Sequence, residues 1–129
     1  IKNHLSGKQT VGIYPLMKDN SCFFLAVDFD KENWKKDLSA VKEICQKKKI
    51  PVYVERSRSG NGGHIWFFFK EKIEASEARR FGTYILSCAM SIRHEINLSS
   101  YDRIFPSQDI LPKGGFGNLI ALPLQKECR

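Results

Sequence analysis

An apolar, β-rich run over residues 22–29 ends in two aspartates that are separated by one residue, Asp28 and Asp30. A strand sends alternate side chains to the same face, so both carboxylates are expected to point the same way, close to one another. Carboxylates placed in this way repel each other unless a cation lies between them, and clusters of hard oxygen ligands suit Mg²⁺ or Mn²⁺. A solvated strand end is also compatible with the pair alone, and the rest of the chain decides between the two interpretations.

Strand and helix patterns alternate along the remaining sequence. Strands are expected over residues 11–16, 22–29, 52–55, 64–69 and 118–123, with a short one near 102–105. Apolar side chains recur at helical spacing over 32–49 and over 75–95. Without the first strand, the order is β-α-β-β-α-β, the ferredoxin-like or RRM-like split β-α-β unit. We therefore expect an α+β domain: an RRM-like palm with an extra N-terminal strand, a mixed but mainly antiparallel sheet, and helices on one face.

The expected topology brings separate parts of the chain to one edge of the sheet. The strand 64–69 is almost wholly apolar, which is typical of a central strand, and it should lie antiparallel beside 22–29. A final strand over 118–123 would run parallel to 64–69 and start at the same edge. The groups expected to converge there are Asp28, Asp30, the loop 56–63, His64 and the segment leading into Asn118.

A polar, glycine-rich loop with the sequence RSRSGNGG fills residues 56–63. Glycines let backbone N–H groups approach an anion, hydroxyls donate hydrogen bonds, and an arginine adds positive charge. The loop lacks the G-x-x-x-x-G-K-[ST] pattern of a P-loop, and an ordinary flexible hairpin loop remains the alternative. The residues expected to hold phosphates are Ser57, Arg58, Ser59, Gly62 and Gly63.

His64 begins the apolar strand directly after two glycines. Its ring could donate a hydrogen bond to a phosphate oxygen, although a lone histidine is more often structural. The other histidines, His4 and His94, have no comparable context. His64 therefore joins the candidate nucleotide-binding residues, while the other two do not.

A third carboxylate is expected from Asp102, because the loop that it opens leads back to the same edge. Asp109 is a competitor, and a turn cap or a pair with Arg103 is the alternative role for Asp102. Lys113, beside three glycines, could touch nucleotide or template, or it could belong to a surface loop. An acidic pair, a third carboxylate, a histidine and a phosphate loop together suggest two-metal phosphoryl chemistry.

Composition limits the possible partners. The chain has 129 residues, which suits one domain over 1–129, and a formal charge of +7, which favours an anionic partner such as nucleic acid or nucleotides. No apolar run reaches the roughly 20 residues of a membrane span, and no signal-peptide pattern opens the chain. Four cysteines without zinc spacing are expected to be reduced thiols in a cytoplasmic protein. Because the first residue is Ile1, we also expect a domain excised from a larger protein.

Three motifs in this order resemble those of the archaeo-eukaryotic primases: Val27-Asp28-Phe29-Asp30, Gly62-Gly63-His64 and Tyr101-Asp102. Longer strings are similar to one branch of that family, the primase domain of the multidomain TOTE conflict systems of prokaryotes and their mobile elements. These strings are GIYPL, LAVDFDK, ERSRSGNGGH, YDRIFPSQD and KGGFGNLIALPLQ. The similarity runs from about His4 to Gln125, nearly the whole chain.

The resemblance implies a primase-polymerase catalytic domain with an RRM-like palm. Asp28, Asp30 and Asp102 would bind the divalent ions, and His64, with Ser57 and Ser59 nearby, would bind the triphosphate of an incoming NTP or dNTP. The 3′-hydroxyl of a nucleic-acid primer would attack the α-phosphate, and pyrophosphate would leave. Relatives usually share one polypeptide with a helicase and a nuclease. This chain is short and lacks the zinc element of many relatives, so template binding is expected to need neighbouring domains.

Two other functions remain open from the sequence. A non-catalytic RRM-like module would stack bases on exposed aromatic side chains, for which the run from Trp66 to Phe69 is available, but the acidic trio argues against simple RNA binding. A metal-dependent nuclease would use the same carboxylates for hydrolysis, although a phosphate loop for a mononucleotide favours transfer. Dependence on divalent ions would distinguish a primase-polymerase from the binding module, and release of pyrophosphate would distinguish it from the nuclease.

Overall fold

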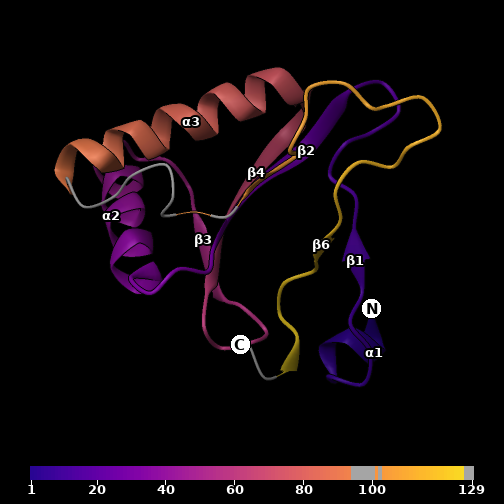
Figure 1. Cartoon of the computed structure of the whole chain (residues 1–129), viewed down its shortest axis with the longest axis horizontal. Coiled ribbons are helices and arrows are strands. Elements are labelled where there is room, and N and C mark those ends of the chain that lie inside the picture. The colour runs from indigo at the N-terminus through magenta and orange to yellow at the C-terminus, as the bar shows by residue number, and fades with distance from the viewer. Residues whose placement is uncertain (94–100, 102, 127–129) are drawn as a thin grey trace.

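The computed structural model describes residues 1–93, 101 and 103–126. Its larger part is an α+β layer that consists of a four-stranded sheet and two helices (Figure 1). The elements of this layer follow one another as β2 (Ser21–Phe29), α2 (Trp34–Lys47), β3 (Tyr53–Arg56), β4 (Gly63–Glu74), α3 (Ala75–Ile92) and β5 (Arg103–Phe105). The predicted α+β class is confirmed, while the last strand of this layer is β5 and not the segment predicted over 118–123.

The sheet has the strand order β3-β4-β2-β5, and every neighbouring pair is antiparallel. The two long strands, β2 and β4, therefore lie side by side at its centre, as the sequence predicted. Their register pairs Asp28 with His64 and Phe29 with Gly63, so the end of β2 meets the start of β4. The loop between β3 and β4 lies at the same edge of the sheet.

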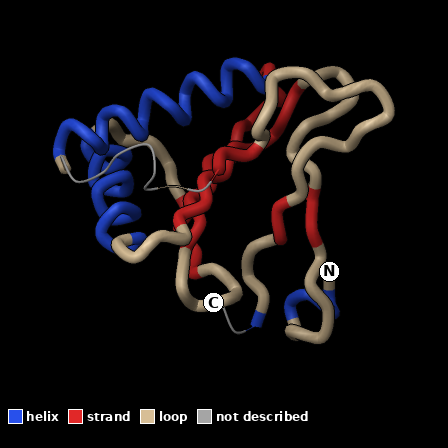
Figure 2. Tube along the Cα trace, in the orientation of Figure 1, coloured by secondary structure: helices blue, strands red, loops and turns tan. Residues whose placement is uncertain are grey.

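Both long helices cover one face of the sheet, where the main core forms (Figure 2). Alternate residues of the central strands, including Leu25, Val27 and Phe67, are buried there against α2 and α3. Cys22 and Cys45 are fully buried in this core as well, where their free thiols pack as small apolar groups. No helix among the described residues combines the length and the apolarity needed to cross a bilayer.

The end of α2 shows why the chain turns directly into β3. The N–H of Ile50 donates to the carbonyl of Cys45, and the N–H of Lys49 donates to that of Gln46. These two hydrogen bonds form a Schellman motif, which needs a residue in the left-handed conformation after the C-cap. Lys49 takes that conformation with φ of 55°, and Pro51 prevents the helix from continuing.

A second, smaller part of the chain lies over the other face of the sheet (Figure 1). It contains α1 (Lys2–Leu5) and a two-stranded antiparallel sheet of β1 (Gly12–Ile13) and β6 (Ile120–Ala121). His4 is buried at the centre of this part: the N–H of Val11 donates to its Nδ1, and its Nε2 lies 3.1 Å from the carbonyl oxygen of Pro123. Both ring nitrogens are thus used, and His4 has a structural role.

Two strand predictions were wrong. The segment predicted as 118–123 does not join the four-stranded sheet, because β5 takes the place beside β2 and β6 pairs with β1 instead. The segment before Asn118 consequently lies away from the Asp28 edge, with Gly117 next to Leu16. Likewise, the extra N-terminal strand predicted over 11–16 does not join the four-stranded sheet, because β1 pairs with β6 and the tight turn of residues 17–20 leads on to β2 without pairing of β1 with β2.

The place of β6 depends on which strand edges are free to pair with it. In β5, Ile104 pairs with Val27, and Phe105 pairs with Ala26 on the face that the helices leave open. Once β5 occupies this edge of β2, β6 has no free strand edge there. Its N–H and C=O groups must still find partners, and β1 supplies them.

Candidate functional site

A row of four charged or titratable side chains crosses the open face of the sheet at the edge where β2 ends. The register places Glu55, His64, Asp28 and Arg103 opposite one another on β3, β4, β2 and β5. Neighbours in the row alternate in sign, acid beside base, which is the favourable arrangement for cross-strand pairs. The open face, rather than the strand tips alone, thus carries the candidate site.

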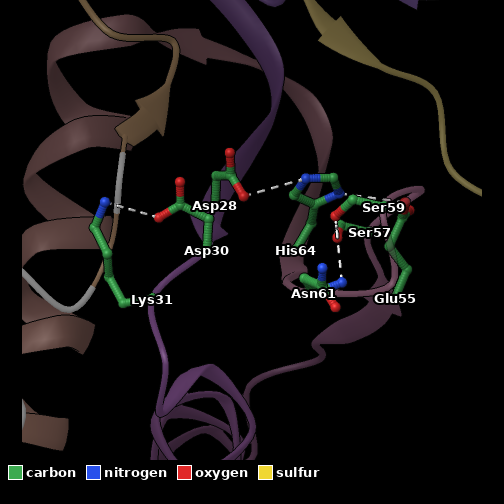
Figure 3. Close-up of polar contacts among 8 residues, drawn as sticks. All are labelled: Asp28, Asp30, Lys31, Glu55, Ser57, Ser59, Asn61 and His64. Carbon is green, nitrogen blue, oxygen red and sulfur yellow. Dashed lines mark hydrogen bonds and ion pairs between the residues drawn. The ribbon is translucent and has the colours of Figure 1, made fainter.

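His64 is held between two carboxylates (Figure 3). Its Nε2 lies 3.4 Å from Asp28 Oδ1, and its Nδ1 lies 3.2 Å from Glu55 Oε1. Burial by itself would lower the pKa of this ring, but the hydrogen bonds and charges of Asp28 and Glu55 outweigh burial and raise the pKa to about 9. The imidazole is therefore a cation at neutral pH, and it contributes positive charge in the middle of the acidic groups.

Asp30 lies just beyond the end of β2, beside Asp28, as Figure 3 shows. Its Oδ1 is 3.0 Å from the ammonium of Lys31, and both side chains are about half exposed. Each aspartate thus has its own cation, His64 or Lys31, and their mutual repulsion is smaller than the sequence suggested. The pair remains together at one edge, as predicted.

The chemistry of these donors fits a hard divalent cation. Asp28 and Asp30 provide carboxylate oxygens at one place, and such oxygens are the preferred ligands of Mg²⁺ and Mn²⁺. Glu55 adds a buried Oε2 for which the described residues supply no hydrogen-bond donor. Among the described residues, however, no cluster of three or more potential metal ligands forms. Asp102, the predicted third carboxylate, lies outside the described residues, and the residue that follows it, Arg103, is the register partner of Asp28.

The loop between β3 and β4 is docked against the aspartate pair. A Cβ added to Gly62 would lie 2.6 Å from the backbone oxygen of Phe29 and 3.3 Å from Cα of Asp30. A Cβ on Gly63 would meet Leu38 at 2.6 Å and the carbonyl of Glu55 at 2.8 Å. The two glycines are therefore needed for close packing, and this packing brings the loop to the end of β2.

The loop itself presents hydroxyl groups and a guanidinium. Ser57 Oγ and Ser59 Oγ are 3.1 Å apart, and the backbone N–H of Asn61 donates to Ser59 Oγ. Arg58 extends away from the sheet and donates from Nη1 to Thr10 Oγ1 at 3.0 Å. It thereby lines a cavity of about 440 Å³ together with Gly7, Lys8, Gln9, Thr10 and Gln125. None of these lining residues is acidic, so the cavity is suited to an anion.

Lys113 and Asp109 are not brought to this edge. The N–H of Leu111 donates to the side chain of Asn20, directly before the start of β2, whereas Asp28 lies at its end. Lys113 follows two residues later in an exposed turn. Asp109 forms an ion pair with Arg79 on α3. Asp109 therefore does not compete for the role of third carboxylate beside Asp28.

Sequence reasoning missed Glu55 and Lys31, and it considered Arg103 only as a partner of Asp102. Glu55 could have been found from the hairpin register, because a loop over 57–62 places residues 55 and 64 opposite each other. Lys31 directly follows Asp30, but its side-chain direction depends on the chain leaving the sheet there.

Comparisons with known proteins identify the family. Among curated protein sequences, no match to this chain was found. A family model does match, namely that of the archaeo-eukaryotic primase domain of the TOTE conflict system, over residues 1–129. The chain belongs to the archaeo-eukaryotic primase domain family of TOTE conflict systems.

Proposed function

We propose that this domain is the nucleotidyltransferase of a primase-polymerase, which adds nucleotides to the 3′-hydroxyl of a nucleic-acid strand. The observation that carries the proposal is the convergence at one sheet edge of Asp28 and Asp30, the cationic His64 and the hydroxyl-bearing loop. These groups come from separate parts of the sequence, and family membership gives their meeting a functional explanation. The proposal includes a longer polypeptide in which helicase and nuclease domains accompany this one.

In the proposed reaction, a bond forms between the 3′-oxygen and the α-phosphorus of the incoming nucleotide, and the bond from that phosphorus to the oxygen that bridges to the β-phosphate breaks. Pyrophosphate leaves, and the proton of the 3′-hydroxyl is released to solvent. Mg²⁺ or Mn²⁺ bound at the carboxylates would activate the attacking oxygen and stabilise the leaving group. Asp28, Asp30 and Asp102 are the residues that would hold it.

The remaining residues would bind the triphosphate. His64 carries a positive charge at neutral pH, because its pKa is raised to about 9 by the two flanking carboxylates after the opposing effect of burial. Ser57 and Ser59 can donate hydroxyl hydrogens to phosphate oxygens, and Arg58 adds a second positive charge. Gly62 and Gly63 keep the loop backbone close to the aspartates. Lys113 lies away from this edge, so no contact to the nucleotide is proposed for it.

The direct test is the binding of a labelled non-hydrolysable nucleoside triphosphate, with and without Mn²⁺. Wild type should bind it in a metal-dependent way, and Asp28→Asn/Asp30→Asn should lose that dependence. The matched control is Asp19→Asn/Asp109→Asn, which changes the net charge equally but removes two exposed ion-paired carboxylates at the other end of the sheet. Equal loss of binding in both double variants would refute a specific role for Asp28 and Asp30.

The same variants separate transfer from hydrolysis. With a primed template and nucleotides, wild type should release pyrophosphate while the primer becomes longer. A nuclease would shorten the strand and release no pyrophosphate, and that result would contradict the proposal. Circular dichroism of the Asp28→Asn/Asp30→Asn variant should match that of wild type, since both side chains lie at the surface edge of the sheet.

A further inference from the structure

The open face of the four-stranded sheet is covered over only part of its width. Towards β5 it is closed by β6, where Ile120 packs in a small core with Phe24, Ala26, Trp66 and Phe105. Towards β3 the cover ends, and two aromatic side chains remain exposed: Tyr53 is 60% and Phe68 is 53% accessible. Both lie on the same face as His64, because Tyr53 pairs with Trp66 and alternate residues of β4 share a face.

The exposed rings pack against one another and, through Phe68, against a buried ring. Phe68 stacks on Trp66 with ring centroids 6.0 Å apart and an interplanar angle of 6°, and Trp66 is only 2% accessible. Tyr53 meets the edge of Phe68 at 5.5 Å. A ring whose motion is restricted by neighbouring rings loses less entropy when a flat ligand stacks on it. The pair therefore forms a preorganised aromatic surface.

An exposed ammonium lies beside this aromatic surface, which suits a nucleic-acid strand. Along β4, the open face presents His64, then Trp66, then Phe68, and then the exposed Lys70, at spacings of roughly 7 Å. Aromatic rings suit bases, which all have a π-face, and an ammonium beside them suits the phosphates between the bases. On β3, Tyr53 lies two residues from Glu55, the end of the row that contains Asp28. The aromatic pair is thus next to the candidate active site, on the same face.

We propose that Tyr53 and Phe68 form a stacking platform for the bases of a single-stranded nucleic acid, which crosses the open face towards Asp28. The inference rests on the proposed function in one respect, namely that the partner of this domain is nucleic acid. It assigns a substrate-strand subsite to two residues outside the aspartate, histidine and loop motifs. The protein would bind such a strand by base stacking, which depends little on nucleotide sequence.

The test uses Tyr53→Leu/Phe68→Leu, which keeps apolar side chains at both exposed positions but removes the rings. Tyr84→Leu is the matched control, because Tyr84 is as exposed as Phe68, at 53%, but belongs to α3 on the opposite side of the sheet. The probes are fluorescein-labelled oligo(dT), oligo(U) and an abasic oligodeoxynucleotide of the same length, measured by fluorescence anisotropy in EDTA. Leaving out divalent ions separates this test from that of the metal-dependent nucleotide site.

Wild type should bind the base-bearing strands more tightly than the abasic strand. The double leucine variant should lose about tenfold in affinity for oligo(dT) or oligo(U) and keep its affinity for the abasic strand. The Tyr84→Leu control should behave as wild type.

Three results would overturn the platform. One is equal wild-type affinity for base-bearing and abasic strands, and another is unchanged oligo(dT) and oligo(U) binding in the double variant. The third is a wild-type dimer in light scattering that becomes a monomer in the double variant, since the occupant would then be a second copy of the chain. Metal-dependent nucleotide binding that persists in the double variant would show that such a failure concerns this subsite and not the proposed activity.

Discussion

Replacing Glu55 by glutamine should lower the pKa of His64 in the metal-free protein without breaking its hydrogen bonds. The amide oxygen of glutamine can still accept from Nδ1, so only the negative charge at 3.2 Å is removed. An opposite charge at this distance commonly changes a pKa by one to three pH units, and Asp28 remains on the other nitrogen. Starting from about 9, the pKa should therefore fall by roughly one to two pH units.

The same coupling makes stability depend on pH. The pKa of His64 rises from 6.5 in the unfolded chain to about 9 in the folded one, which at 1.36 kcal/mol per pH unit is about 3 kcal/mol. Because the folded pKa is the higher one, this contribution is fully present below about pH 6.5 and is lost as the pH rises through about 9. Only 12% of the His64 side chain is exposed, so solvent screening removes little of it.

Two measurements check this reasoning. In an NMR titration of the histidine ring protons, with His64→Gln used for assignment, Glu55→Gln should show the lower pKa. Glu43→Gln, which removes an exposed carboxylate paired with Lys47, should leave it unchanged. Urea unfolding at pH 6 and at pH 9 should show a loss of stability in wild type that is absent in His64→Gln. A wild-type His64 that titrates near 6.5 would refute the argument that the carboxylates dominate over burial.

Three further predictions follow from the packing. Gly62→Ala should lower the free energy of unfolding by about 1–3 kcal/mol in a urea titration, because the new Cβ would lie only 2.6 Å from the backbone oxygen of Phe29. The control Gly115→Ala, whose Cβ would have its nearest atom at 3.4 Å, should change this free energy by less than about 0.5 kcal/mol. Lys49→Gly should stabilise the protein by about 1 kcal/mol, because glycine adopts the left-handed conformation at φ of 55° without strain. Lys48→Gly, at φ of −87°, should destabilise the protein, and the melting temperatures of the two variants distinguish these outcomes. Burial raises the pKa values of the Cys22 and Cys45 thiols to about 11, so in a Cys128→Ser background both should react with a thiol reagent only after unfolding. The partly exposed Cys88 should react in the native protein, and rapid modification of all three would contradict the burial of Cys22 and Cys45.

Much of the fold could be predicted because its central elements have strong periodic patterns. The apolar runs that became β2 and β4, and the helical spacing that became α2 and α3, are local signals whose type does not depend on distant partners. The element order then limits the topology, and the meeting of Asp28 with His64 follows from the antiparallel pairing of the two central strands. The short strands carry weaker signals, and the pairing of β6 was accordingly wrong.

The candidate site, like the fold, could be predicted in part from the sequence. The sequence by itself determined that Asp28, His64 and the glycine-rich loop meet at one edge, because strand direction and the period of two fix which residues face one another. Only the tertiary structure decided what surrounds them: Arg103 completes the row through the register of β5, Arg58 reaches Thr10 on the N-terminal segment, and Lys113 lies away from Asp28. The physical reason is that backbone periodicity is a local property, whereas the partners of a side chain depend on which distant segments pack over it. The exposure of Tyr53 and Phe68 also depends on distant segments, since Ile120 of β6 packs over Trp66 and Phe105 and leaves these two rings accessible.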